Sequence, residues 1–315
     1  MSGPGRSRGA PPVTGPVVVL AGGTGGAKLA RGMLDVVGPD DLVVIANTAD
    51  DIEIYRAYVS PDPDLITFWL ADQIDERGWG LAGDTFRVMD GLRELGIAVW
   101  FNLGDRDLAI GIERARRLAA GERLTDAHKA IADALNVNAR VLPMSDHPVR
   151  TRVRAQGRWW PFQEFMIRAR GEGPVEDVDY HGARAAKPTP EVRTAIATAR
   201  AIVIGPSNPV ISIGPILAVA GVRRAIAKSP APVVAVSPLV GGEVLKGPTS
   251  AFMDYTGHPL TSAGIAAAYA DLIDGLVADA PTDALPTLET DVLMDTAEKR
   301  RRVAEQTLDF ASALA

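Results

Sequence analysis

The sequence contains no cysteine among its 315 residues. This absence excludes disulfide bonds, thiolate nucleophiles and zinc sites with sulfur ligands, and it favours a cytoplasmic protein. Histidine is scarce as well, and the four histidines show no metal-ligand spacing, so we expect structural or surface roles for them. They are His128, His147, His181 and His258.

Long apolar runs and long basic runs are also missing. No apolar stretch approaches the roughly 18 residues of a membrane span, and the start of the chain lacks the apolar core of a signal peptide. A formal net charge of -6 and a pI near 5.3 argue against nucleic acid or an anionic membrane as a partner. We therefore expect small-molecule ligands, and an anionic one would need local help from Lys, Arg, backbone N–H groups or a metal.

The residues that are present describe a globular α/β protein. Hydrophobic residues make up 47% of the chain and charged residues 23%, which is enough for a full core. Strand-like apolar runs alternate with helical patterns, and this predicts a doubly wound, Rossmann-like and mostly parallel sheet. The expected strands are Val17–Ala21, Leu42–Ala46, Ile97–Asn102, Ala201–Gly205 and Val233–Ser237, with helices such as Gly83–Leu95 and Pro190–Arg200 between them.

The alternation is interrupted between residues 124 and 180. There a helix is followed by Arg140–Met144, Thr151–Ala155 and Phe162–Arg170, which have the pattern of an antiparallel elaboration. We therefore predict a mobile tail at 1–16, a core of 17–123 and 181–315, and a smaller inserted α+β subdomain at 124–180. Asp295 or Thr296 is expected to cap a last helix.

A glycine-rich turn follows the first strand. It contains Gly22, Gly23, Thr24, Gly25, Gly26 and Lys28. Glycines let a backbone approach a ligand closely, and the N–H groups at the start of the next helix favour an anion such as a diphosphate, with Lys28 as an added charge. The spacing matches neither the dinucleotide fingerprint nor a Walker loop, so a turn that only packs a helix on the sheet remains the alternative.

Carboxylates follow the second strand and recur shortly afterwards. Asp50 and Asp51 should lie at the same sheet edge as the glycine-rich turn, and two prolines should stiffen a loop that carries Asp62 and Asp64. Magnesium usually takes one or two protein carboxylates, so Asp50 or Asp51 together with Asp64 would suffice. The alternative is that Asp62 and Asp64 cap a helix over 65–71.

Three more segments contain residues that are typical of ligand-binding sites. Arg77–Gly80 contains Trp79, which could stack on a planar ligand, and 102–107 contains Asp105, although a tryptophan plug and a structural Asp–Arg pair explain them equally well. In 205–216, three prolines and two glycines fix a turn after a strand. Ser207, Asn208 and Ser212 could donate to phosphate oxygens there, facing the first turn, and a merely stiff connection is the alternative.

Taken together, these segments resemble the 2-phospho-L-lactate transferases, also called phosphoenolpyruvate transferases, of coenzyme F-420 biosynthesis. The resemblance covers nearly all of the chain after residue 16, and it rests on residues 21–28, 47–51, 61–64, 77–80, 103–107 and, most specifically, 205–216. It implies that a phospho-lactyl or phospho-enolpyruvyl group moves from a guanosine diphosphate ester to the terminal ribityl hydroxyl of the deazaflavin Fo. GMP would leave, and Mg²⁺ would be the cofactor.

The resemblance also implies residue roles. Gly22 to Lys28, with Ser207 and Asn208, would hold the guanosine diphosphate, while Asp50 and Asp64 would bind Mg²⁺ and orient the hydroxyl, with Asp51 as the substitute for either. The choice of donor and the identity of the general base are left open. A homodimer is expected, because apolar α/β surfaces of this kind commonly dimerise.

Two other functions compete with this one. A non-catalytic, nucleotide-sugar-binding regulator of the gluconeogenesis-factor type has a comparable glycine-rich opening, but it has no evident need for Asp64 or Arg77–Gly80. An NAD-dependent dehydrogenase would require an acidic residue at the end of the second strand, where this chain has Asn47.

Overall fold

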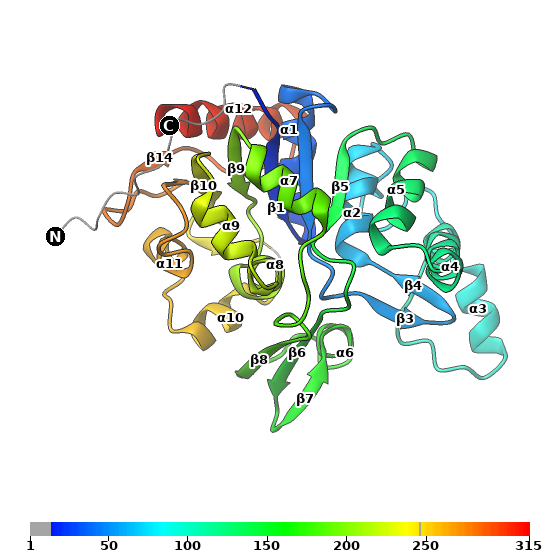
Figure 1. The fold of residues 1–315 in the computed structure, drawn as a ribbon. Helices are drawn as coiled ribbons and strands as arrows, with labels where there is room; N and C mark the ends of the chain where they lie inside the picture. The colour runs from blue at the N-terminus through cyan, green and yellow to red at the C-terminus, as the bar shows by residue number, and fades with distance from the viewer. Residues whose placement is uncertain (1–13, 246) are drawn as a thin grey trace.

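A seven-stranded sheet forms the centre of the computed structural model, which describes residues 14–245 and 247–315 (Figure 1). Residues 1–13 of the expected tail lie outside the described residues. All six strand pairings are parallel, and the order is β14-β13-β10-β9-β1-β2-β5. The strands are β1 (Val17–Ala21), β2 (Leu42–Ala46), β5 (Arg140–Pro143), β9 (Ala201–Ile204), β10 (Val233–Val236), β13 (Gly275–Ala278) and β14 (Thr287–Glu289).

Helices cover both faces of this sheet, because its central strands are apolar on both sides. Val17 and Val19 of β1 pack on the side of α1 (Gly23–Val37), α2 (Pro61–Leu70) and α12 (Ala297–Ala313). Val18 and Leu20 pack on the opposite side, against α7 (Pro190–Thr198), α9 (Val222–Lys228) and α11 (Ser262–Ala268). The prediction of a doubly wound α/β sheet is confirmed.

The strand order places a topological switch point beside β1. From β1 the chain builds outward to β2 and β5 on one side, and it then crosses back to place β9 on the other. Leu20 consequently pairs with Ile45 of β2 and with Ile204 of β9. In open α/β sheets such a switch point is where ligands bind, beyond the carboxyl ends of the strands.

A small antiparallel sheet lies below the main sheet at the bottom of Figure 1. It contains β6 (Arg150–Ala155), β7 (Arg158–Pro161) and β8 (Val175–His181), and α6 (Phe162–Ile167) follows β7. Phe165 of α6 packs edge to face on Phe252 of α10 (Thr249–Thr256), with ring centres 6.2 Å apart. The expected antiparallel elaboration is therefore present.

Two segments within that elaboration were predicted wrongly. Arg140–Met144 was expected in the antiparallel part, but Arg140–Pro143 pairs in parallel with β2 at the edge of the main sheet. The reason is α5 (Leu124–Ala134), which packs on β5 and completes an ordinary strand–helix–strand crossover. Phe162–Arg170 was expected as a strand and instead begins with α6. The domain boundaries themselves stay a prediction.

A second small unit contains the hairpin β3 (Ile52–Ile54) and β4 (Ala57–Val59), together with α3 (Arg87–Glu94) and α4 (Asp105–Ala119). The strand predicted at Ile97–Asn102 is absent, because this segment has no regular structure. Its apolar residues serve a local core instead, in which Phe101 packs with Met89 and Leu108. An apolar segment that packs into a local core of helices and loops can therefore have the same sequence pattern as a buried strand.

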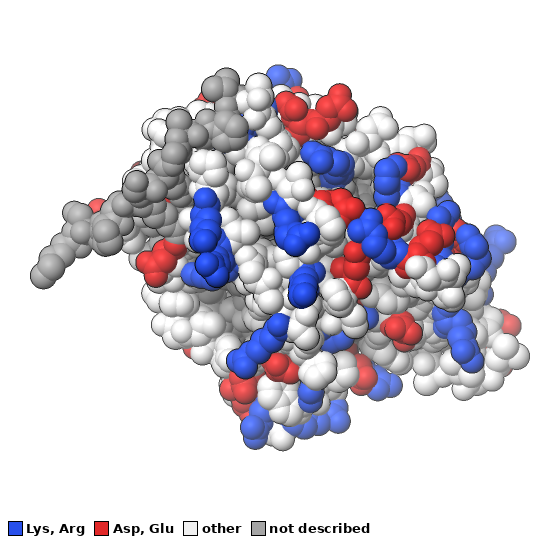
Figure 2. Space-filling model, in the orientation of Figure 1, with Lys and Arg blue, Asp and Glu red and all other residues white. Residues whose placement is uncertain are grey.

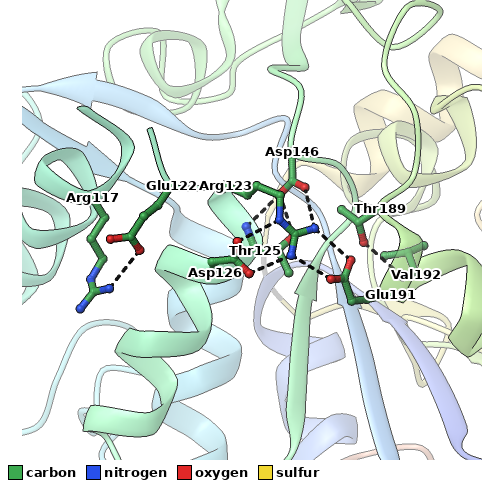
Figure 3. Close-up of polar contacts among 9 residues, drawn as sticks. All are labelled: Arg117, Glu122, Arg123, Thr125, Asp126, Asp146, Thr189, Glu191 and Val192. Atoms are coloured by element: carbon green, nitrogen blue, oxygen red, sulfur yellow. Dashed lines mark hydrogen bonds and ion pairs between the residues drawn. The ribbon is translucent and has the colours of Figure 1, made fainter. Parts of the chain in front are cut away.

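Ion pairs fix the loops near β5. Arg123 bridges Asp126 in the first turn of α5 and Glu191 in the first turn of α7 (Figure 3). Asp146, which follows β5, accepts hydrogen bonds from the Thr125 N–H at 2.9 Å and its hydroxyl at 2.7 Å. The Arg123 guanidinium lowers the pKa of Glu191 to about 2. This network ties two helix N-termini together across the outer part of the sheet.

Acidic and basic side chains are interspersed on the face shown in Figure 2. Within the described ranges no single helix has both the length and the apolar character needed to cross a membrane. One bent pair of short helices, Pro209–Ala218 with Val222–Lys228, meets the length and composition requirement.

Candidate functional site

Two loops interlock at the switch point. One is the glycine-rich turn after β1, and the other joins β9 to the π-helix η1 (Pro209–Ile213) and α8 (Gly214–Ala218). The Gly22 N–H donates to Ser207 Oγ at 3.3 Å. A Cβ atom added to Gly25 would lie 2.0 Å from the Pro206 carbonyl oxygen, and one on Gly26 would lie 2.6 Å from Ser207 Oγ. These glycines are therefore required for the two loops to touch.

The first loop leads directly into a helix N-terminus. Helix α1 begins at Gly23, its first turn has no acidic residue, and Gly22 provides no side-chain cap. Backbone N–H groups at such an end attract anions. The Lys28 ammonium lies 5.8 Å from the ring centre of Trp69 in the last turn of α2. The role of Lys28 in phosphate binding stays a prediction.

The second loop is held by side-chain caps. Asn208 Oδ1 accepts from the N–H groups of Val210 at 2.8 Å and Ile211 at 3.1 Å, and its amide donates to Thr249 Oγ1 at 3.2 Å. The Asn208 side chain is thus engaged in holding the loop, whereas Ser207 accepts a hydrogen bond from the glycine-rich turn.

Tyr180 of β8 supplies a hydrogen bond that the π-helix itself lacks. In a π-helix the carbonyl of residue 210 would accept from the N–H of residue 215, but Pro215 has none. The Tyr180 hydroxyl donates to the Val210 carbonyl at 2.5 Å instead. A Cβ atom on Gly214 would lie 2.2 Å from the Tyr180 hydroxyl oxygen, so this glycine makes room for the ring. The antiparallel sheet thus braces the second loop.

Asp62 joins the carboxylate-bearing segments to the glycine-rich turn. Its Oδ1 accepts from the Gly23 N–H at 2.7 Å, and its Oδ2 accepts from Asn47 Nδ2 at 2.9 Å. Residues 61–64 do not form the expected stiff loop, because α2 already begins at Pro61, where proline suits the first helical position. The alternative prediction, in which Asp62 and Asp64 cap a helix over 65–71, is also wrong about where this helix begins, because both residues lie inside α2. Sequence reasoning therefore missed Asp62 as the acid that reaches the turn.

Asp50 and Asp51 are buried beside this point, with 7% and 3% exposure. Asp50 Oδ1 and Asp51 Oδ2 have no hydrogen-bond donor, while the other Asp51 oxygen accepts from the Ser60 hydroxyl at 2.7 Å. Burial raises the pKa of Asp51 to about 7, and the Arg150 charge opposes that shift. Burial and the nearby Asp62 carboxylate raise the pKa of Asp50 well above its ordinary value.

The two carboxylate oxygens that lack a donor are better explained as ligands of a divalent cation than as unpartnered atoms in the protein core. Buried carboxylate oxygens normally have donors, and magnesium takes one or two carboxylates before water and phosphate complete its shell. Among the residues that the structure describes, no three Asp, Glu or His side chains form a metal cluster, so a cage made wholly of protein is not present. The donor set suits an ion shared with a phosphate ligand.

Asp64 forms an ion pair with Arg114. Its Oδ2 is 3.0 Å from Arg114 Nη1, and its Oδ1 accepts from Arg114 Nη2. Burial raises the pKa of Asp64, and the Arg114 guanidinium opposes that shift. The metal-binding and catalytic roles given to Asp50 and Asp64, with Asp51 as substitute, stay predictions.

The remaining predicted segments show mixed outcomes. Trp79 is 47% exposed and therefore is not a plug, and the Arg77 guanidinium lies 4.4 Å from its ring centre. Asp105 has a structural task at the start of α3, where it accepts from the N–H groups of Arg87 at 3.2 Å and Val88 at 3.0 Å.

The fold and the interlocked loops define a doubly wound α/β protein with a glycine-rich turn at its switch point and buried carboxylates beside it. Within this class, the chain belongs to the family described as 2-phospho-L-lactate transferase CofD, whose model matches residues 17–308. The resemblance inferred from the motifs is confirmed, and the family is one of transferase enzymes.

Named relatives agree with this assignment. The chain is 44% identical over 271 residues to the phosphoenolpyruvate transferase of Kitasatospora aureofaciens, covering 84% of each chain. It is 37% identical over 299 residues to the 2-phospho-L-lactate transferase of Methanosarcina mazei, covering 92% of this chain and 98% of the relative. A solved structure of protein BH3568 from Bacillus halodurans matches with a TM-score of 0.61 over 94% of this chain and 100% of that one, at 17% identity, which shows a shared fold.

Proposed function

We propose that the protein transfers a phospho-lactyl or phospho-enolpyruvyl group from a guanosine diphosphate ester to the terminal ribityl hydroxyl of Fo. The hydroxyl oxygen would bond to the phosphorus that carries the lactyl or enolpyruvyl ester. The bond from that phosphorus to the bridging oxygen would break, and GMP would leave with the bridging oxygen. The observation that carries this proposal is the contact of the glycine-rich turn with the Ser207 loop at the switch point, beside buried carboxylate oxygens that lack a hydrogen-bond donor.

The diphosphate would lie between the loops. Backbone N–H groups in the first turn of α1 and the Ser207 hydroxyl are the donors that the structure offers there. Asp62 already takes the Gly23 N–H, so it sets the shape of the turn and leaves the following N–H groups to phosphate oxygens. An aligned acceptor hydroxyl is the main requirement of such a displacement, because GMP is a good leaving group.

Asp50 and Asp51 are the residues that fit Mg²⁺, through Asp50 Oδ1 and Asp51 Oδ2. When bound, the ion supplies charge neutralisation at the diphosphate and lowers the pKa of the attacking hydroxyl. Burial raises the pKa of both carboxylates in the absence of the ion, and a bound Mg²⁺ would favour their ionised form. One of them would take the hydroxyl proton.

The decisive experiment combines the purified protein with Fo, Mg²⁺ and each guanylylated donor. Mass spectrometry should then detect the coupled deazaflavin and free GMP, and EDTA should stop their formation. Absence of product from every donor, together with tight binding of a nucleotide sugar, would favour the regulator instead.

Two expectations about the protein's setting are part of this proposal. The lack of cysteine supports a cytoplasmic location. The proposed homodimer would have about twice the 33.3 kDa mass of the chain. Light scattering coupled to size exclusion measures that mass directly, and a single-chain mass would refute the dimer.

A further inference from the structure

A fully buried ion pair lies behind the carboxylates of the proposed site. Arg114, in the middle of α4, has 0% exposure. Its two terminal nitrogens both donate to Asp64, and Nη1 also donates to the Tyr58 carbonyl at 2.9 Å. One guanidinium therefore joins α4, the first turn of α2 and the strand β4. Lysine could not replace it fully, because only arginine offers a planar fork of donors.

Glycine at position 111 allows this contact. It lies about one turn before Arg114 on α4, and a Cβ atom there would be 3.0 Å from Ala57 Cβ and 3.4 Å from the Tyr58 carbonyl oxygen. The helix can therefore lie directly against β4. Arg114 then reaches both partners without leaving the core.

His128 of α5 faces the same pair and adds no charge. Its Nδ1 is 4.0 Å from Asp64 Oδ1, and its Nε2 is 3.2 Å from Thr67 Oγ1. Thr67 gives its hydroxyl hydrogen to the Pro63 carbonyl at 2.8 Å, so Nε2 carries the hydrogen of the imidazole. Burial, and then Arg114, lower the pKa of His128 to about 3, which keeps the ring neutral. The Arg114 charge is therefore balanced directly by Asp64.

The two acids of the first turn of α2 point to different partners. Asp62 binds the Gly23 N–H and Asn47, whereas Asp64 binds Arg114. We infer that Arg114 is a positioning residue, which holds the first turn of α2 through Asp64 and so keeps Asp62 against the glycine-rich turn. On this assignment Asp64 belongs to the brace and not to the reacting groups. The inference rests on the proposed transferase function.

A double-mutant cycle tests the brace with Arg114→Met, Asp64→Asn and the double variant. Each single variant leaves one buried charge without its partner, so we expect the melting temperature to fall by roughly 6–10 °C. Displacement of the turn by about 1 Å should lower kcat by about 100-fold. The Mg²⁺ concentration for half-maximal activity should stay within about twofold of wild type, because neither residue is assigned to the ion.

The double variant should melt higher and turn over faster than either single variant, because no uncompensated charge remains. Arg114→Lys keeps the charge and should lose less activity than Arg114→Met, which gives a second test if the methionine variant does not fold. Arg116→Met is the matched control on the same helix, since Arg116 is 63% exposed and pairs with the exposed Glu113. Its melting temperature and kcat should not change.

Two outcomes would overturn the inference. Normal kcat per folded molecule in Arg114→Met would reduce the pair to a purely structural role. A raised Mg²⁺ requirement in Asp64→Asn, without recovery in the double variant, would make Asp64 a ligand. If wild type transfers nothing from any donor, the proposed function fails, and the melting temperatures still measure the coupling of the pair.

Discussion

Replacing Gly25 by alanine should separate the two loops. Gly25 lies in the first turn of α1 and does not have a positive φ, so the backbone itself accepts alanine. Only space excludes the methyl group, which would lie 2.0 Å from the Pro206 carbonyl oxygen. Since Cβ contacts below 3.0 Å essentially do not occur, the second loop would have to retreat by at least about 1 Å.

The cost follows from this displacement. Overpacking of a well-packed site costs about 1–3 kcal/mol, and a backbone carbonyl in a proline-fixed turn places Gly25→Ala at the upper end. The gain in helix propensity is at most about 1 kcal/mol, so we expect a net loss of about 2 kcal/mol. The melting temperature should then fall by roughly 4 °C. Affinity for GDP should fall by more than about tenfold, because the loops would no longer face one another.

Gly91→Ala is the control for this prediction. Gly91 is also helical, in α3, and no described heavy atom lies within 4 Å of its added Cβ. Alanine there should stabilise the protein by about 0.5–1 kcal/mol. Calorimetry for GDP binding and thermal melts of both variants complete the test. If Gly25→Ala binds GDP and melts like wild type, the contact between the two loops does not shape the GDP site.

Three further predictions concern single side chains. Asp50→Asn should lower turnover by at least about 100-fold. In EDTA the variant should have a melting temperature equal to or above that of wild type, because the buried side chain without a donor can no longer carry a charge. Turnover at the wild-type rate would reject the role of Asp50. Burial raises the pKa of Asp51 to about 7, so the stability of its protonated form is fully present below about pH 4 and is lost as the pH rises through 7. In EDTA, the free energy of unfolding of wild type, measured relative to Asp51→Asn, should therefore fall by up to about 4 kcal/mol between pH 4 and 8. Urea melts that give the same difference between the two proteins at both pH values would contradict the pKa shift. Tyr180→Phe should lower the free energy of unfolding by about 1–2 kcal/mol and weaken GDP binding, because the Val210 carbonyl loses the Tyr180 donor. Tyr255→Phe is the control: it loses a hydrogen bond to an exposed aspartate and should bind GDP normally.

The position of the glycine-rich turn at the switch point could be predicted because it depends on local patterns. Buried strands such as β1 and β9 are short runs of β-branched residues, and the glycine and proline turns that follow them are equally local. Parallel strands place their carboxyl ends at one edge, so the glycine-rich turn and Ser207 had to open on the same side. The match to the 2-phospho-L-lactate transferase family over residues 17–308 confirms the resemblance that these segments indicated.

Two segments were harder to predict, because the spacing of their apolar residues does not show whether they form a strand or which element they pack against. Ile97–Asn102 has the composition of a strand, but it packs Phe101 into a local core beside α3 and α4. Arg140–Pro143 is a true strand of the main sheet, and only its pairing with β2 reveals this. Partner choice across about 100 residues of chain is not encoded in either segment alone.

Sequence by itself determined which residues could carry charge, turn sharply or fill a core, because these properties belong to single side chains and their near neighbours. Only the tertiary structure decided how the carboxylates were divided. Asp62 and Asp64 are two residues apart and chemically identical, yet one binds the glycine-rich turn and the other binds Arg114. Their partners come from 39 and 50 positions away along the chain, and long-range packing alone brings those partners within hydrogen-bond distance.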